Sequence, residues 1–137
     1  MSPHRAIVAA GSNIEPEKNL KEAAKRLGSR HRLLATSSVR ETPPFGNADQ
    51  ANFLDQVFLM ETTLDAPAFK ASLKEVEDQL GRIRGPENKF GPLTIDLDLI
   101  AWNGEVVDPD FYRHEFLREG ALEVEPKLKC EGQKSGD

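Results

Sequence analysis

Residues 94–104, with the sequence TIDLDLIAWNG, alternate polar and apolar side chains and then reach an Asn-Gly pair. Such alternation is typical of a strand with two different faces, and Asn-Gly predicts a tight hairpin turn. Asp96 and Asp98 therefore lie on one face, about 7 Å apart along the strand. At an effective dielectric near 20 they repel by roughly 2 kcal/mol, which a divalent cation would turn into attraction. Two solvated surface aspartates are the equally simple interpretation of the pair alone.

The rest of the chain supplies elements in an order that predicts one fold. Apolar stripes at spacings of three and four predict two helices, and runs or alternation of strand-forming residues predict three more strands. The expected elements are a strand at 5–10, a helix at 16–27, strands at 33–42 and 52–63, and a helix at 66–80. This order predicts an α+β, ferredoxin-like βαββαβ fold, with both helices on one face of an antiparallel sheet and the ligand site on the other.

Particular residues mark where these elements end. Gly28 and Gly81 are placed to end the two helices in the left-handed conformation, and Asp65 is placed to cap the second helix. Beyond residue 104 the pattern weakens to a loop-rich segment with a short helix near 118–123. We expect residues 1–126 to form one domain and residues 127–137 to be a polar, disordered tail.

Composition excludes several classes of protein. The 137 residues carry a net charge of −5, which disfavours a nucleic-acid-binding protein because such proteins need a large basic surface. The apolar runs are too short for a membrane span, and the N-terminal residues do not resemble a signal peptide. Cys130 is the single cysteine, so no intramolecular disulfide is possible. The single cysteine predicts a protein of the reducing cytoplasm. We also expect a monomer.

A basic segment precedes the aspartate pair. Arg82, Arg84 and Lys89 lie in a stretch punctuated by glycine and proline, where cations could reach a phosphate chain. Carboxylates that hold magnesium beside cations that hold phosphate oxygens are what phosphoryl transfer requires. The alternative is a structural loop in which these cations pair with Asp78 and Glu87. The common phosphate-binding glycine motifs are absent from the sequence.

Two residues of the 52–63 strand point to a second ligand. Phe53 and Asp55 share a face, so they offer an aromatic surface and a carboxylate acceptor to a flat heterocycle with paired N–H donors. The proline-stiffened segment 42–46 could form a wall of such a pocket, or be a plain turn. Core packing is the alternative for Phe53. His4 and His31 have no evident partner in the sequence.

Several segments together resemble the 6-hydroxymethyl-7,8-dihydropterin pyrophosphokinase family, a family of folate-pathway enzymes. They occur in the family's order and spacing, with about one inserted residue between positions 84 and 91. The matching segments are GSNI (11–14), SS (37–38), TPPFG (42–46), DQ (49–50), FL (53–54), GRIR (81–84) and GPLTIDLDL (91–99).

The resemblance implies transfer of the β,γ-diphosphate of ATP to the hydroxymethyl oxygen of a pterin, with release of AMP. By position, Asp96 and Asp98 would hold two magnesium ions, and with Arg82 they would be the catalytic residues. The residues that would bind ATP are Lys74, Glu77, Arg82, Arg84, Lys89, His114 and Arg118. The residues that would line the pterin pocket are Thr42, Pro43, Pro44, Phe45, Phe53 and Asp55.

The chain departs from the family pattern at two informative positions. Leu93 stands where the family typically has an arginine, and Asp55 where it has an asparagine. Phe116 and Arg118 are the nearest candidates for the aromatic and arginine that follow the family's histidine. The alternatives are therefore a non-catalytic pterin- or nucleotide-binding homologue, a kinase for another pterin-like acceptor, and a ferredoxin-like RNA-binding module, which the net charge disfavours.

Overall fold

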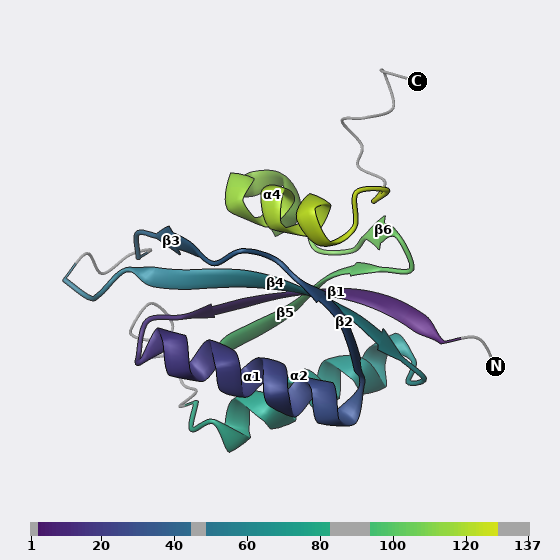
Figure 1. Ribbon diagram of the computed structural model, residues 1–137, viewed down its shortest axis with the longest axis horizontal. Coiled ribbons are helices and arrows are strands. Elements are labelled where there is room, and N and C mark those ends of the chain that lie inside the picture. Colours follow the sequence, from purple (N-terminus) through teal and green to yellow (C-terminus); the bar gives the residue numbers. More distant parts are fainter. Residues whose placement is uncertain (1–2, 45–48, 83–93, 129–137) are drawn as a thin grey trace.

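The computed structural model describes residues 3–44, 49–82 and 94–128. These segments form a mixed sheet-and-helix fold in which the sheet separates two layers of helices (Figure 1). The elements are β1 (His4–Ser12), α1 (Pro16–Arg30), β2 (Arg32–Thr36), β3 (Arg40–Thr42), β4 (Phe53–Thr62), α2 (Ala66–Gln79), β5 (Asp96–Trp102), β6 (Glu105–Val106), α3 (Asp110–Arg113) and α4 (Glu115–Val124).

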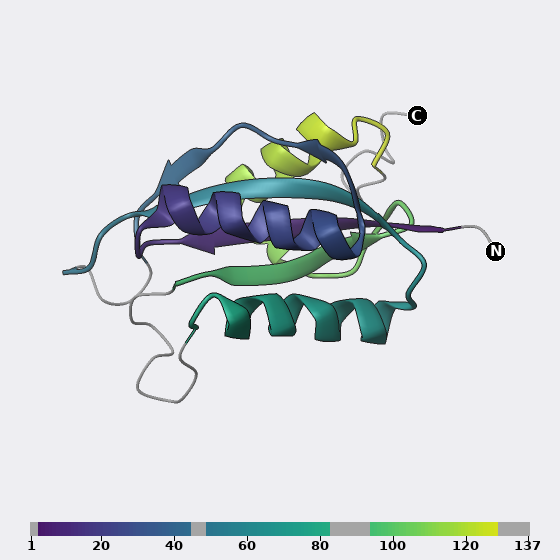
Figure 2. The ribbon, with the colours of Figure 1, turned by 60° about the horizontal axis from the view of Figure 1, so that its bottom comes forward.

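The sheet has the strand order β2-β4-β1-β5-β6, with β3 also paired to β4, and all its pairings are antiparallel. Counting β2 and β3 as one interrupted strand, this is the predicted ferredoxin-like order. Helices α1 and α2 lie side by side across one face (Figure 2). None of the helices in the described segments is long and apolar enough to cross a membrane.

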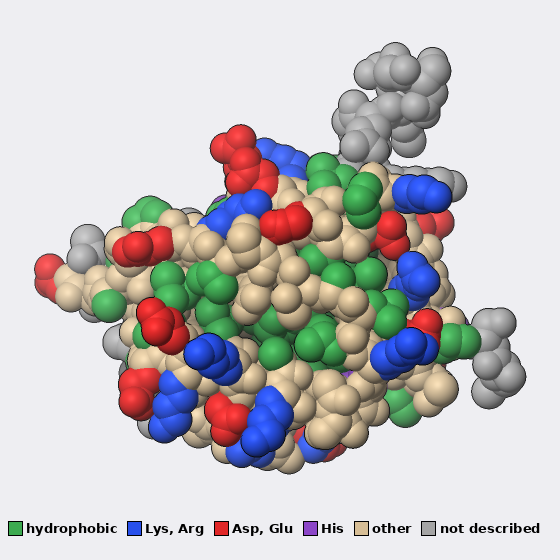
Figure 3. Space-filling view, in the orientation of Figure 1, with side chains coloured by type: hydrophobic (Ala, Val, Ile, Leu, Met, Phe, Trp, Pro, Cys, Tyr) green, Lys and Arg blue, Asp and Glu red, His purple; other side chains and the backbone are tan. Residues whose placement is uncertain are grey.

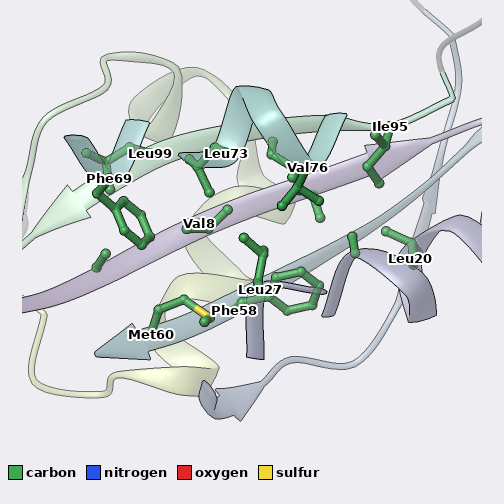
Figure 4. Close-up of a cluster of buried hydrophobic side chains, with 14 residues drawn as sticks. Val8, Leu20, Leu27, Phe58, Met60, Phe69, Leu73, Val76, Ile95 and Leu99 are labelled. Atoms are coloured by element: carbon green, nitrogen blue, oxygen red, sulfur yellow. The ribbon is translucent and has the colours of Figure 1, made fainter. Parts of the chain in front are cut away.

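The main core lies between the sheet and helices α1 and α2 (Figure 4). Phe58 and Met60 of β4 are fully buried there, as are Leu27 of α1 and Phe69 of α2. Burial of each such side chain contributes about 1.5–3 kcal/mol. The alternation predicted for β4 is confirmed, because Phe58 and Met60 face this core while Val57 and Leu59 face the other side.

The opposite face is only partly free, which corrects the expectation that it is left to ligands. Helix α4 covers the Val57–Leu59 part of β4, and Phe111 and Ala121 lie fully buried in a second apolar cluster there. Leu128 belongs to the same cluster, so the packed chain reaches beyond residue 126. The short helix predicted near 118–123 is confirmed as part of α4, but its packing over the sheet was not predicted, because α4 buries one short stripe and α3 buries only Phe111.

The strand predicted at 33–42 is interrupted. Ser37 separates β2 from β3: its backbone N–H donates to the Val57 carbonyl, and its side-chain oxygen accepts from the Val57 N–H at 2.8 Å. One hydroxyl thus replaces a backbone acceptor in the ladder. Glu123 of α4 accepts from the N–H of the next residue, Ser38, at 2.8 Å, so the break also anchors α4.

The predicted ends of the elements are confirmed except at Gly28. Gly81 has φ +92° after α2, and the Asp65 carboxylate accepts from the Ala68 N–H at 2.9 Å. Asn103 also has a positive φ, as the predicted hairpin turn requires. Helix α1 instead continues through Gly28 to Arg30, because the N–H of residue 31 still donates to a carbonyl four residues earlier, 2.8 Å away.

Both histidines without an assigned partner have one in the fold. The His31 ring bridges two hydroxyls, with Nδ1 3.0 Å from Thr62 Oγ1 and Nε2 2.9 Å from Ser72 Oγ. Burial, followed by the charge of Arg30, lowers its pKa. His4 Nδ1 lies 3.0 Å from Asn103 Nδ2. These partners are more than 30 residues distant in sequence, so local pattern carries no trace of them.

Two glycines inside helices predict opposite effects on stability. A Cβ at Gly120 would lie 2.5 Å from Val57 Cγ2, whereas one at Gly28 would lie 3.8 Å from the Leu33 Cβ. Gly120→Ala should therefore lower the free energy of unfolding by about 1–3 kcal/mol through overpacking. Gly28→Ala should raise it by about 0.5–1 kcal/mol through helix propensity. Urea denaturation measures both, and stabilisation by both variants would contradict the close packing of α4.

A carboxylate-lined pocket and a basic groove

Three adjacent strands bring the predicted site residues together. In the sheet register Gly11 of β1 lies opposite Asp55 of β4 on one side and opposite Asp96 of β5 on the other. Residues opposite one another in a sheet project from the same face. The two carboxylates therefore flank Gly11 on the face that carries α4.

These residues line a pocket of about 160 Å³ beside α4. Seven predicted site or candidate residues take part, and several apolar residues complete the wall. The predicted residues in the lining are Thr42, Phe53, Asp55, Asp96, Asp98, His114 and Phe116. The prediction that Phe53 and Asp55 lie on one face is therefore confirmed, and the ligand that they would bind stays a prediction.

Gly11 makes room for Asp55. A Cβ at position 11 would lie 2.9 Å from Asp55 Oδ1, so any larger side chain would displace this carboxylate. The other carboxylate oxygen, Oδ2, accepts the Thr42 hydroxyl at 2.6 Å. Burial is the largest influence on Asp55 and raises its pKa to about 6; the Thr42 hydrogen bond opposes this rise, and the Asp96 charge adds to it.

Asp98 is the most strongly perturbed carboxylate. Its surface is open to solvent at the pocket mouth, yet the walls around its carboxyl group remove enough water to be the largest cause of its raised pKa, about 8. The charge of Asp96 is the next cause.

The donor set suits magnesium in one respect. No group of three or more histidine, cysteine or acidic side chains within metal-binding reach occurs in the described segments. Magnesium is commonly held by only one or two carboxylates, with waters and substrate phosphates completing its shell. The Asp96 and Asp98 pair fits that pattern better than a fully protein-built metal site.

A second depression adjoins the pair on the other side. It is a groove of about 560 Å³ between α2 and the outer edge of β5, and Asp96 and Asp98 line it too. Lys70, Lys74 and Arg82 contribute its cations. The aspartate pair thus stands between the aromatic pocket and a groove with basic walls.

Glu77 lies beneath this groove and is buried. Its Oε2 accepts the Leu97 N–H at 2.6 Å, which satisfies a donor on the outer edge of β5. The same oxygen accepts from Arg82 Nη1 at 2.6 Å, and Arg82 Nη1 also donates to Asp96 Oδ1 at 2.9 Å. Glu77 therefore ties α2, the strand backbone between the aspartates, and Arg82 together.

Other predicted site residues lie elsewhere. Pro43 and Pro44 are not part of either lining. Arg118 donates to the backbone carbonyls of Phe111 and Tyr112 at 3.3 and 2.8 Å, which fastens α3 to α4. The predicted residues that lie outside the described segments are Phe45, Arg84 and Lys89.

Sequence reasoning missed two further acidic residues of the pocket. Asp108 lines it from the connection between β6 and α3, and Asp110 lines it from the first position of α3. The Asp108 side chain accepts the Asp110 N–H at 2.9 Å. The Asp-Pro-Asp sequence at 108–110 was the available signal, but only the return of the chain over the sheet places it near β5.

Asp98 predicts a dependence of stability on pH. Its pKa is raised in the folded chain, so the folded state holds a proton that the unfolded chain releases near pH 4, and stability falls as pH rises from about 4 to 8. Asp98→Asn should therefore stabilise the protein by about 1 kcal/mol at pH 8, allowing for solvent screening, and little at pH 4. Thermal unfolding at both pH values, with the exposed α2 variant Asp78→Asn as control, measures this; equal effects at both would contradict it.

Comparisons with known proteins show the family of the chain. Residues 7–126 match the family model described as 7,8-dihydro-6-hydroxymethylpterin-pyrophosphokinase (HPPK). A 2-amino-4-hydroxy-6-hydroxymethyldihydropteridine pyrophosphokinase of Methylorubrum extorquens is 33% identical over 132 residues, which cover 89% of this chain and 79% of that protein. The protein of the same name from Bacillus subtilis is 35% identical over 108 residues, covering 77% of this chain and 64% of its own.

A solved structure supports the fold. The crystal structure of a Plasmodium falciparum HPPK-DHPS triple mutant superposes with a TM-score of 0.55 at 13% sequence identity, over 74% of this chain and 28% of that one. At that identity the likeness concerns the fold alone. The family model, in contrast, spans the strands and helices that build both the pocket and the groove. The chain therefore belongs to the 7,8-dihydro-6-hydroxymethylpterin-pyrophosphokinase family.

Proposed function

We propose that this chain transfers diphosphate from ATP to the hydroxymethyl group of 6-hydroxymethyl-7,8-dihydropterin, releasing AMP, as a step of folate biosynthesis. Family membership and the shared name of its relatives support this activity. The observation that carries it is the position of Asp96 and Asp98 between a pocket with an aromatic wall and a groove with basic walls. A heterocyclic acceptor and a polyphosphate donor would meet there.

The residues divide the work between the two substrates. Asp96 and Asp98 would hold two magnesium ions, which supply charge neutralisation on the phosphate oxygens when bound. Lys74 and Arg82 line the groove and would hold the phosphate chain by charge. Phe53 and Asp55 line the pocket and would orient the pterin ring. Catalysis then consists of holding the hydroxymethyl oxygen in line with the β-phosphorus while water is kept away.

The first test is formation of AMP from MgATP with and without the pterin, separated from ADP by chromatography. We expect AMP to appear only with the pterin and to fall at least about a hundredfold in Asp96→Asn, judged from the loss of a transition-state charge contact. Glu105→Gln, an exposed change on β6, is the control and should keep its activity. AMP formation that survives Asp96→Asn would contradict the role of the aspartate pair.

A non-catalytic pterin- or nucleotide-binding homologue is the second candidate. It is favoured by Leu93, which lies outside the described segments and stands where the family typically has an arginine. Tight MgATP and pterin binding without AMP would select this candidate. AMP formed only with a different pterin-like acceptor would instead change the substrate. The monomeric state and the cytoplasmic location, which rests on the single Cys130, are likewise proposals.

Asp55 predicts a dependence of pterin binding on pH. As a carboxylate it would accept the N–H donors of the pterin, and with a pKa near 6 it loses this capacity in more acidic solution. Pterin affinity should therefore fall by up to about tenfold for each pH unit below 6. Asp55→Asn should abolish that fall, because an amide does not titrate. Quenching of pterin fluorescence between pH 5 and 7.5 measures both proteins, and parallel profiles would contradict a direct contact.

A further inference from the structure

The Arg82 guanidinium contacts the Asp96 carboxylate, where a bound cation would also lie. Its Nη1 lies 2.9 Å from Asp96 Oδ1 and 2.6 Å from Glu77 Oε2, so one guanidinium nitrogen neutralises a carboxylate of the metal-type pair and a buried carboxylate below it. The Arg82 side chain is 21% exposed, the Glu77 side chain 4% and the Asp96 side chain 36%, so water screens the Arg82–Glu77 contact weakly and the Arg82–Asp96 contact more strongly. Within the described segments Asp96 is thus already paired with a cation.

One hydrogen-bond donor of the Arg82 guanidinium has no partner among the described residues. Its Nε is buried without a hydrogen-bond partner in the part of the chain that the structure describes. An unpaired buried donor carries a desolvation cost, which lowers the penalty for moving the guanidinium elsewhere. The groove beside it offers room of about 560 Å³ and further cations, Lys70 and Lys74, that would attract an anion.

We propose that Arg82 is an internal counter-ion of Asp96 that exchanges places with a divalent cation, and that Glu77 is the positioning residue that holds it there. Cation binding at Asp96 frees the Arg82 guanidinium for an anion in the groove, so the two ligands reinforce each other. This inference rests on the proposed function only in taking Asp96 as a cation ligand. It requires that the nucleotide-free chain bind cations more weakly than its carboxylates alone would.

Glu77 is suited to this role because it touches both partners of the exchange. Its Oε2 holds the Leu97 N–H, which lies between the two aspartates in sequence, and it holds Arg82. When Arg82 leaves Asp96, Glu77 stays fixed to the strand and keeps the arginine nearby. The bond to the Leu97 N–H fixes Glu77, and the bond to Glu77 keeps Arg82 near Asp96 and the groove.

The decisive experiment measures Mn²⁺ binding to the nucleotide-free protein from the electron paramagnetic resonance signal of free Mn²⁺. Arg82→Met keeps an unbranched apolar stem but removes the competing guanidinium, and should raise Mn²⁺ affinity by about tenfold, the value of one charge-assisted hydrogen bond. Lys70→Met removes a positive charge from the same groove without touching Asp96 and should change the affinity by less than about twofold. Equal effects of the two variants would overturn the proposal.

A reversal of sign distinguishes exchange from a merely structural role. Arg82→Met should lower the affinity of the protein for the complex of Mn²⁺ with inorganic tripolyphosphate by about tenfold, because the guanidinium that would bind the anion is missing. Stronger retention of the complex by Arg82→Met would overturn the proposal. A simple gain or loss of structure would shift both measurements in the same direction.

Two further comparisons keep the test decisive. Arg82→Met leaves Glu77 unpaired and could therefore unfold the protein. In that case the double variant Arg82→Met/Glu77→Gln is compared with Glu77→Gln, in which the amide oxygen can still accept the Leu97 N–H. The double variant should bind Mn²⁺ more tightly than Glu77→Gln. Equal Mn²⁺ affinities of the two would overturn the exchange. If the unsubstituted chain forms AMP with the pterin but Arg82→Met leaves Mn²⁺ affinity unchanged, the exchange alone is refuted. If Arg82→Met raises Mn²⁺ affinity but the unsubstituted chain forms no AMP, only the proposed activity is refuted.

Discussion

Repulsion among carboxylates that the backbone register holds together is the constraint on which the site depends. Pairing of β1 with both β4 and β5 sets Asp55 and Asp96 on either side of Gly11, and Asp98 follows on the same face. Like charges at this spacing are costly unless something offsets them. Two contacts offset this cost, the Thr42 hydroxyl on Asp55 and Arg82 on Asp96. Burial, with a smaller contribution from the Asp96 charge, raises the pKa of Asp55 and of Asp98.

Much of the fold follows from residue patterns because its main elements are amphipathic. The period-two alternation of β4 and β5 determines which side chains face the core, so Phe53, Asp55, Asp96 and Asp98 could be assigned to one face from sequence. These patterns do not determine which strands pair with one another. The pairing was predicted from the order of helices and strands, because few arrangements of that order are compatible with short, right-handed connections.

The features that sequence reasoning missed depend on contacts between distant residues. The continuation of α1 through Gly28 is an exception, because it depends on a local backbone bond from the N–H of residue 31 to a carbonyl four residues earlier. The interruption at Ser37 requires a hydroxyl to meet the Val57 amide. Likewise α4 buries its stripe only because Gly120 lets it approach Val57. A weakly patterned segment can therefore form a whole layer when a glycine permits close contact.

The mixture of charges on the surface agrees with a protein that binds small anions locally. On the face shown in Figure 3, acidic and basic side chains are interspersed around an apolar middle region, and neither sign forms a continuous field there. Among the described residues, the groove beside α2 gathers three cations, Lys70, Lys74 and Arg82. Short-range charges of this kind act within about a Debye length of 8–10 Å.

The interrupted strand at Ser37 has a consequence for how the molecule coexists with its own copies. β2 and β3 form the outer edge of the sheet beside β4, where unpaired backbone groups can recruit a strand from another chain. Between them the Ser37 hydroxyl bonds inward to the Val57 amide, and Glu123 of α4 covers the Ser38 N–H. The edge is thereby divided into runs of five and three residues. Neither run is long enough to be a good template for edge-to-edge aggregation.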